Sequence, residues 1–418
     1  MKVDVTTLSN GLRVVTDEMD SIESVSLGVW MNVGTRHETA DVNGISHLLE
    51  HMAFKGTARR SAQQIAEEMD NVGGHLNAYT SRDHTAYFAK VLKGDLGLAV
   101  DVLSDILLNS TMDAEELERE KHVIVQEISQ ANDTPDDIIF DRFQAKAYPD
   151  QPMGWPVLGS ESLVRAVTSQ RLKDYLGGHY AAEHAVVAAA GAVDHDKFVA
   201  DVERAFAALK PKTSLRQVPG TYTGGEFRET RDLDQVHLVF GFQGVPYLDP
   251  DYYNVAALST LMGEGMSSRL FQEIREKRGL AYAVFSSTQS FADTGLFTIY
   301  TGTAADEVPK LIPVLCDEIR KTADTITDDE VRRAKAQLKS SILMSLESPS
   351  ARCTQWARQL VVYGRLLKAD EVIARVEEID RARIQACAGR IFSGTPTMAA
   401  VGDLDTLEEF GAIRERLQ

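Results

Sequence analysis

The chain has 418 residues, of which 44% are apolar and 25% are charged, a balance typical of a folded globular protein. A chain of this length is expected to form two or more domains with substantial hydrophobic cores. Its 62 acidic residues outnumber its 44 basic ones, which gives a formal net charge of −18. This balance disfavours a nucleic-acid-binding protein, because phosphate contacts require clustered Lys and Arg. It favours a cationic partner, or simply high solubility.

The three cysteines, Cys316, Cys353 and Cys387, include no C-x-x-C pair. They predict neither a disulfide framework nor a thiolate metal site, and they favour a reducing compartment. No run approaches the ~18 apolar residues that a membrane-spanning helix needs. The acidic N-terminal segment lacks the pattern of a signal or transit peptide. We therefore expect a cytoplasmic bacterial protein, or a mitochondrial matrix protein whose transit peptide has been removed.

Residues 211–227 divide the chain into two halves. This stretch is rich in Pro, Gly, Ser and Thr, and we expect it to link one domain spanning residues 1–210 to another spanning 228–418. The halves resemble each other, because AAAGAVD, which ends at Asp194, recurs as AAVGDLD, which ends at Asp405. In each half this strand of small residues precedes an acidic helical stretch.

Two helical segments also recur, at an offset near 214 residues. ISHLLEHM (45–52) corresponds to LSTLMGEGM (258–266), and MDAEELEREKHVIVQEI (112–128) corresponds to ITDDEVRRAKAQLKSSI (326–342). The period is too long for a solenoid, whose repeats span about 20–50 residues. The predicted fold class is therefore α+β, with two homologous domains of about 200 residues each. We expect each domain to be a mixed or antiparallel sheet covered by helices.

The segment His47-Leu48-Leu49-Glu50-His51 indicates a metal site. Gly44 and Gly56 favour a short helix between them. Positions four apart share one face of a helix, so both imidazoles can reach a single ion, with Glu50 beside them. Two neutral nitrogens suit Zn²⁺, which takes about four ligands and keeps one position open in catalytic sites.

A third protein ligand must come from elsewhere, and Glu127 is the best donor. Glu120 and Glu127 lie two helical turns apart and therefore point the same way. One can bind the ion while the other braces a ligating imidazole. In the second half, the positions that correspond to the two histidines and two glutamates carry other residues, namely Leu261, Gly265, Ala334 and Ser341. This pattern predicts one active half and one half without ligands.

Each part of this pattern also has a simpler interpretation. A histidine pair at this spacing is often two surface or core imidazoles, and a glutamate pair is often a solvated helix face. His75 and His84 have other spacings and are expected to be ordinary, with His84 a minor candidate ligand. The combination of the HLLEH segment with a distant pair of glutamates favours zinc, with one ion per chain.

HLLEHMAFKGT resembles the inverted zinc motif of the inverzincins, the family of pitrilysin, insulin-degrading enzyme and mitochondrial processing peptidase. The segments LSNGLRVV, GTRHE, GGHLNAYTSRDHT and EREKHVIVQEI extend the resemblance, at spacings similar to those of the processing-peptidase β branch. The length resembles the small branch of the family, in which one chain forms half of a closed chamber. The resemblance implies a zinc metalloendopeptidase that hydrolyses unfolded peptides or presequences.

The resemblance also assigns residues. It implies that His47, His51 and Glu127 bind zinc, that Glu50 is the general base and that Glu120 is a carboxylate behind the ligands. An ion-activated water would give its proton to Glu50 and attack a peptide carbonyl, and Glu50 would pass the proton to the leaving amine. Substrate contacts are implied for a further set, which comprises Phe54 at the pocket beyond the scissile bond and Asn77, Ala78 and Tyr79 on a strand that pairs with the peptide backbone.

In the second half, MGEGMSSRLFQEIREKRGLAYAVFSS resembles the segment where active members carry an Arg and a Tyr. We assign these roles to Arg269 and Tyr282, whose N–H donors and phenol could hold a peptide backbone or an oxyanion. The alternative is structural, with Arg269 paired to Glu273 and Tyr282 in the core. The short Gly263–Gly265 loop resembles a reduced form of the Gly-rich substrate loop of non-catalytic processing-peptidase subunits.

This chain carries both the zinc ligands and the Arg-Tyr pair. It therefore predicts a homodimer in which the zinc half of one chain faces the Arg-Tyr half of its partner. The expected substrates are unfolded peptides, possibly basic ones, because the chain is acidic. Nucleic acid and membrane spans are not expected. One alternative is a non-catalytic scaffold of the same fold, like the core subunits of the respiratory bc1 complex. A second is an unrelated zinc hydrolase that carries HxxEH by chance, and within the favoured class general peptide degradation competes with presequence processing.

Overall fold

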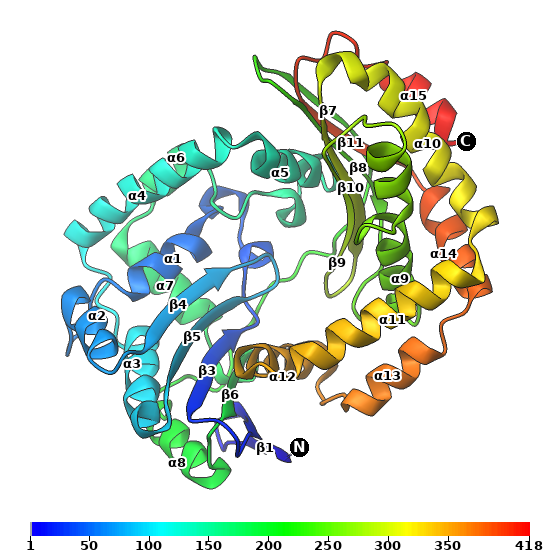
Figure 1. Ribbon diagram of the computed structural model, residues 1–418. Coiled ribbons are helices and arrows are strands. Elements are labelled where there is room, and N and C mark those ends of the chain that lie inside the picture. Colours follow the sequence, from blue (N-terminus) through cyan, green and yellow to red (C-terminus); the bar gives the residue numbers. More distant parts are fainter. Residues whose placement is uncertain (1) are drawn as a thin grey trace. The chain divides into compact units, whose positions relative to one another are not determined.

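The computed structural model describes residues 2–418 and consists of two compact units, each built from discontinuous stretches of chain (Figure 1). The first unit contains the residues up to Ser129 together with Trp155–Val218 and Met344–Leu366. The second unit contains Gln130–Gly154, Pro219–Leu343 and Leu367–Gln418. Each unit is an α+β layer structure, in agreement with the predicted fold class.

A six-stranded sheet forms the centre of the first unit, in the order β1-β2-β6-β3-β5-β4. The strands are β1 (Lys2–Thr7), β2 (Arg13–Glu18), β3 (Ser24–Met31), β4 (His75–Thr80), β5 (Thr85–Leu92) and β6 (Ala185–Gly191). β2 and β6 run parallel, and the other neighbours run antiparallel. β6 is buried along its whole length because helices cover both faces of the sheet, and its small residues fit this position. β4 forms one edge and offers an unpaired backbone.

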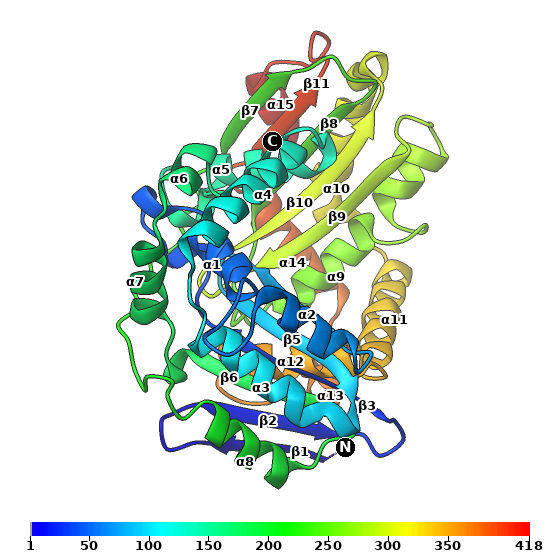
Figure 2. The same ribbon diagram turned by 90° about the vertical axis from the view of Figure 1, so that its left-hand side faces the viewer.

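Most helices of the first unit contribute to the main core, which lies on one face of this sheet (Figure 2). They are α1 (Ile45–Ala53), α2 (Ala62–Asp70), α3 (Leu96–Leu108), α4 (Ala114–Asn132), α6 (Glu161–Ala166), α7 (Ser169–His179) and α8 (His195–Ala205). α1 also contacts the edge strand β4. The predicted HLLEH helix is thus present, and it lies beside an open sheet edge.

The opposite face of the sheet is covered by α12 (Pro349–Tyr363), a helix from the second half of the sequence. Its Trp356 packs on the sheet, while its Arg352 reaches the buried carboxylate of Asp17 on β2. Arg352 Nη1 lies 3.0 Å from both carboxylate oxygens, and the Trp356 indole N–H donates to Asp17 Oδ2 at 2.7 Å. A buried charge pair with this extra donor fixes the position of α12 on the sheet.

The second unit repeats the arrangement with five strands in the order β7-β11-β8-β10-β9. The strands are β7 (Gly225–Thr230), β8 (Val236–Gln243), β9 (Ala283–Ser290), β10 (Gly295–Thr303) and β11 (Thr397–Gly402). One face carries α9 (Tyr252–Gly263), α10 (Val308–Thr325), α11 (Asp328–Ser345), α13 (Ala369–Glu377), α14 (Arg381–Phe392) and α15 (Phe410–Leu417). The other face carries α5 (Pro135–Ala147), a helix from the first half of the sequence (Figure 1).

Apart from the extra edge strand β1, the two sheets have the same strand order. Each contains one parallel pair at the corresponding position, β2 with β6 in the first sheet and β7 with β11 in the second. This agreement supports the duplication expected from the repeated segments. β7 begins at Gly225, inside the stretch predicted as a linker, and the compact units exchange α5 and α12 rather than following two contiguous halves. The predicted domains, residues 1–210 and 228–418, describe the two halves of the sequence repeat, and their limits stay a prediction.

Within residues 2–418, no helix is both long and apolar enough to cross a membrane.

We predict that replacing Arg352 by Met lowers the free energy of unfolding by about 3–5 kcal/mol, because the fully buried Asp17 carboxylate would lose its countercharge. The urea midpoint and the thermal transition of the purified protein measure this change. The matched control is Arg204→Met, which breaks the exposed pair with Asp201 and should cost less than about 1 kcal/mol. Equal effects of the two substitutions would contradict the anchoring role of the buried pair.

Candidate metal centre

Helix α1 presents His47 and His51 on one face, as the four-residue spacing predicts. Their ring centroids lie 4.6 Å apart. The helix begins after Gly44, whose φ of 97° is one that L-residues rarely adopt. Phe54 is the C-cap residue at the other end of the helix. The leucines at positions 48 and 49 are buried in the main core and hold the opposite face of α1 in place.

Helix α4 brings Glu127 to these two rings from a distant part of the chain. Glu127 Oε2 lies 3.8 Å from His47 Nε2 and 3.6 Å from His51 Nε2. One potential ligand atom from each of the three residues lies within 4.8 Å of the others. Among the described residues, this is the group of His, Cys, Asp and Glu side chains whose geometry could hold a metal ion.

The chemistry of this donor set fits Zn²⁺. A tetrahedral ion with bonds of about 2.1 Å places its ligand atoms about 3.4 Å apart, close to the nitrogen–oxygen separations seen here. Burial, together with the nearby His51, lowers the pKa of His47 to about 3, so His47 is a neutral imidazole at neutral pH. Two neutral nitrogens and one carboxylate leave a fourth position for water.

Glu120 orients the second imidazole. Its Oε2 lies 3.0 Å from His51 Nδ1, so Nδ1 carries the proton and Nε2 keeps the lone pair that faces Glu127. Lys55 Nζ holds the other oxygen of Glu120 at 2.6 Å. Burial alone would raise the pKa of Glu120, but the hydrogen bonds from His51 and Lys55 outweigh it and the pKa is lowered. Glu120 is therefore an anion clamped between two donors.

Glu50 lies on the same helix as the histidines, buried to 9% exposure. Thr80, on the edge strand β4, donates its hydroxyl to Glu50 Oε2 at 2.6 Å. The pKa of Glu50 is raised, chiefly by burial and also by the charge of Glu127, while the Thr80 hydrogen bond acts in the opposite direction. A carboxylate with a raised pKa is a stronger base than an exposed one, as general-base chemistry near neutral pH requires.

The residues predicted to contact substrate in the first half lie along β4 and at the end of α1. Asn77 is exposed, and its Oδ1 accepts the backbone N–H of Ala78 at 2.7 Å. The Tyr79 ring packs on the α12 face of the sheet and its hydroxyl meets His84 Nε2 at 3.0 Å, so only the Tyr79 backbone faces the open edge. Phe54 is half-buried, with its ring centroid 6.3 Å from that of Tyr87.

In the second unit, Arg269 is engaged by other residues of the protein. Its guanidinium is 10% exposed and pairs with both oxygens of Glu330, at 2.6 and 2.9 Å. It also donates to the hydroxyl and the carbonyl oxygen of Thr325, at 2.8 Å each. The expected alternative partner, Glu273, pairs with Lys277 and Arg278 instead. These contacts favour a structural role for Arg269, and its contact with substrate stays a prediction.

Arg275, which the sequence analysis did not single out, contacts Tyr282. Its guanidinium carbon lies 4.3 Å from the centroid of the Tyr282 ring and 4.7 Å from that of Phe271, and Nη1 donates to the Tyr282 carbonyl at 3.0 Å. Tyr282 is 76% exposed rather than buried in the core. Arg275 belongs to a π-helical turn, Phe271–Glu276, a rare element that is often found at functional sites.

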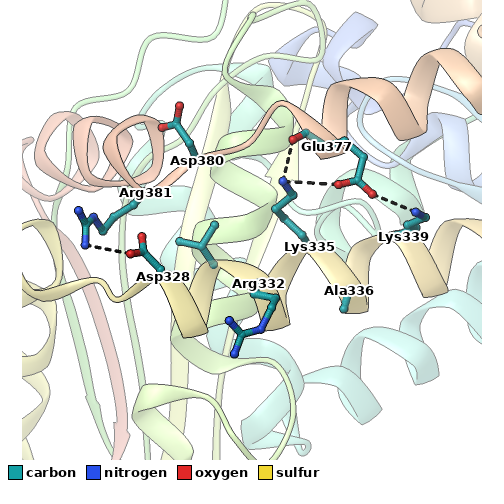
Figure 3. Close-up of a pocket in the computed structure, with 9 residues that line it drawn as sticks. Asp328, Arg332, Lys335, Ala336, Lys339, Glu377, Asp380 and Arg381 are labelled. Carbon is teal, nitrogen blue, oxygen red and sulfur yellow. Dashed lines mark hydrogen bonds and ion pairs between the residues drawn. The ribbon is translucent and has the colours of Figure 1, made fainter.

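Helix α11, the counterpart of α4 in the repeat, uses its polar side chains differently. It lines a hollow of about 520 Å³ with the α13–α14 junction, where Lys335 and Lys339 both pair with Glu377 (Figure 3). Lys335 also donates to the backbone carbonyls of Glu377 and Ile379, at 2.6 and 3.1 Å, and so caps the end of α13. These ion pairs are internal to the second unit and hold no ligand set like that of α4.

Sequence reasoning missed Lys55 and Thr80 at the metal centre and Arg275 in the second unit. Lys55 and Thr80 lie inside the HLLEHMAFKGT and GGHLNAYTSRDHT segments, but their partners Glu120 and Glu50 cannot be read from local spacing. Arg275 lies seven residues before Tyr282, but the chain leaves the π-helical turn between them, so helical spacing does not indicate their contact.

Comparison with known proteins identifies the family. The family model described as Insulinase (Peptidase family M16) matches residues 13–161, and the model described as Peptidase M16 inactive domain matches residues 166–338. A zinc protease of Rickettsia felis is 40% identical over 96% of this chain and 98% of its own length. A probable mitochondrial-processing peptidase subunit beta of Arabidopsis thaliana is 35% identical, over 99% of this chain and 80% of its own length.

Solved structures agree with the fold. The crystal structure of a protease from Helicobacter pylori superimposes with a TM-score of 0.89 at 24% identity, covering 96% of this chain and 99% of that one. The inverted zinc motif, the group formed by His47, His51 and Glu127, and the full-length relatives lead to one assignment. The chain belongs to the insulinase-like peptidase family M16, a family of zinc proteases that includes the mitochondrial-processing peptidase β subunit.

Proposed function

We propose that this protein is a zinc metalloendopeptidase that hydrolyses unfolded peptides or presequences inside a chamber. The observation that carries the proposal is the convergence of His47, His51 and Glu127 beside the buried carboxylate of Glu50. Zinc, one ion per chain, would be held by the two imidazoles and Glu127. When bound there, it would supply the Lewis acidity that lowers the pKa of a water molecule and polarises a peptide carbonyl.

The residues of the chain supply the proton transfers. Glu50 removes a proton from the attacking water and later delivers it to the leaving amine nitrogen. The Thr80 hydroxyl occupies Glu50 Oε2, which leaves the other oxygen of that carboxylate for the water. Glu120 keeps the proton of His51 on Nδ1, so that Nε2 remains a ligand throughout the reaction. The two roles fit the opposite pKa shifts of the two carboxylates, since the pKa of Glu50 is raised and that of Glu120 is lowered.

The edge strand β4 supports binding of an extended peptide. Its outer side has no neighbouring strand, and a substrate that adds to it would run beside α1. Asn77, Ala78 and Tyr79 would contribute backbone groups there, and Phe54 would line the pocket for the residue after the scissile bond. A peptide must be unfolded to pair in this way, because a folded protein does not present a free strand.

Tyr282 and Arg275 are the proposed contacts from the second half. The exposed phenol is held against the Arg275 guanidinium, which can also reach a peptide carbonyl or a developing oxyanion. We propose that these residues act on the zinc site of a partner copy, in a homodimer with two composite sites. The Arg269 guanidinium is already engaged by Glu330, which makes it the less suitable donor.

A cytoplasmic bacterial location is part of the proposal, with the mitochondrial matrix as the alternative. The three cysteines are buried and unpaired, which suits a reducing compartment.

We predict that Glu50→Gln reduces kcat by about 10²–10⁴-fold without changing zinc affinity, because it removes the base and leaves the three ligands. Glu127→Gln should reduce both kcat and zinc affinity, because it removes a ligand. Hydrolysis of a fluorogenic peptide and zinc titration against a chromophoric chelator measure the two quantities.

The control for this experiment is the wild-type protein treated with a chelator and then reconstituted with zinc. It should lose and regain activity. A wild-type protein that binds zinc but cleaves no peptide from an unbiased library would instead favour the non-catalytic scaffold.

The arrangement in trans predicts complementation. Glu50→Gln chains lack the base and Tyr282→Phe chains lack the phenol, so each homodimer should lose at least about 10²-fold in kcat. A mixed dimer would contain one intact composite site if the two residues come from different chains. Mixed dimers isolated with two affinity tags should therefore recover up to half of the wild-type activity. If purified mixed dimers remain as inactive as the parents, each site is built within one chain.

Charge selection can be tested with salt. The acidic chain should attract basic peptides, so the kcat/KM for an Arg-containing peptide should fall as salt rises from low to about 0.5 M. A peptide of the same length with Gln in place of Arg is the control and should respond little. Parallel responses of the two peptides would contradict electrostatic selection.

A further inference from the structure

We propose that Glu38 is a positioning residue that fixes the N-terminal end of the ligand-bearing helix α1. The proposal rests on the metal site described above and adds a residue that lies outside both the ligands and the general base. Glu38 follows a short 3-10 turn, Thr35–His37, and is 4% exposed.

The Glu38 carboxylate replaces the missing cap of α1. The N-cap residue of this helix is Gly44, which has no side chain to satisfy the first N–H groups. Glu38 Oε2 accepts the backbone N–H of Gly44 at 2.9 Å, and Oε1 accepts that of Ser46 at 2.8 Å. The ionised form of the carboxylate also interacts favourably with the helix dipole.

The same carboxylate connects α1 to a second segment. Asn43 Nδ2 donates to Glu38 Oε2 at 2.9 Å and to the carbonyl oxygen of Pro156 at 3.0 Å. A methyl group on Gly44 would come within 2.8 Å of the Cα of Gly159, so the backbones of these two glycines are in close contact. Glu38 thus holds the start of α1 directly, and through Asn43 it is linked to the segment that contains Pro156.

The position of this cap matters because the first ligand follows it at once. His47 is the residue after Ser46, whose N–H Glu38 binds, and His51 lies one turn further along the same short helix. A shift of the first turn would move His47 Nε2 relative to Glu127, which comes from a different helix. Buried carboxylates that orient a ligand in this indirect way typically affect metal affinity by about 10–100-fold.

The pKa of Glu38 is raised to about 7, because burial outweighs the hydrogen bonds from Ser46, Gly44 and Asn43 that act in the opposite direction. Burial of a carboxyl group has a cost in desolvation free energy. A serine or aspartate at position 44 would cap the helix directly, without a distant glutamate. The close contact with Gly159 excludes that simpler solution, because any side chain at position 44 would collide with it. The distant glutamate solves the problem without occupying that space.

The test measures zinc affinity rather than activity. Glu38→Ala should weaken zinc binding by about 10–100-fold in competition with a chromophoric chelator. Glu38→Gln keeps the volume and one acceptor oxygen, so it should fall between Glu38→Ala and the wild type. The absorption spectrum of the Co²⁺-substituted protein should also change in both variants, because the positions of the ligands around the ion would change.

Asp17→Asn is the matched control. It alters an equally buried carboxylate of the same unit that anchors α12 on the other face of the sheet, and it should lower stability while zinc affinity stays within about twofold. Wild-type affinity in folded Glu38→Ala and Glu38→Gln, with an unchanged Co²⁺ spectrum, would overturn the proposal. If Glu38→Ala does not fold, Glu38→Gln decides the outcome alone. A wild-type protein that fails to bind zinc would instead refute the metal site itself.

Discussion

The candidate site depends on the contacts that the Glu120 and Glu127 side chains of helix α4 make with the two histidines of helix α1. Two imidazoles on one short helix can attract a divalent ion, but they complete a site only when a carboxylate reaches them from elsewhere. Glu127 does so at 3.6–3.8 Å from both ring nitrogens. Burial keeps His47 neutral. At His51 the effect of burial is outweighed by the hydrogen bond to Glu120 and by the nearby carboxylates, which raise its pKa, so a bound cation must displace a proton there.

Around these contacts, several buried carboxylates differ in their partners and therefore in their chemistry. Glu120 is clamped by His51 and Lys55 and stays ionised, whereas Glu50 has one hydroxyl partner and a raised pKa. Glu38 binds backbone N–H groups and stabilises a helix end. The same functional group thus orients an imidazole, has a raised pKa or caps a helix according to the number and charge of its donors.

The second unit shows how little of this chemistry the fold itself requires. Its sheet repeats the strand order of the first, yet α11 carries Ala334 and Ser341 where α4 carries Glu120 and Glu127. The polar side chains of α11 form ion pairs with the neighbouring helices instead. Each sheet is also covered on its second face by a helix from the other half of the sequence, α12 in one unit and α5 in the other. The duplication therefore preserved layers and topology, while the ligands remained in one unit.

The sequence by itself determined the features that depend on local spacing. The i, i+4 histidines and the two glutamates two turns apart predict shared helix faces whatever the surroundings, and the repeated segments predict a duplicated α+β fold. Tertiary structure alone decided which distant groups meet: Thr80 with Glu50, Lys55 with Glu120, Glu330 with Arg269, and Arg275 with Tyr282. It also placed α12 on the first sheet through Asp17. Helical periodicity fixes directions along one element, whereas these contacts depend on how separate elements pack, and packing is a property of the whole core rather than of any local pattern.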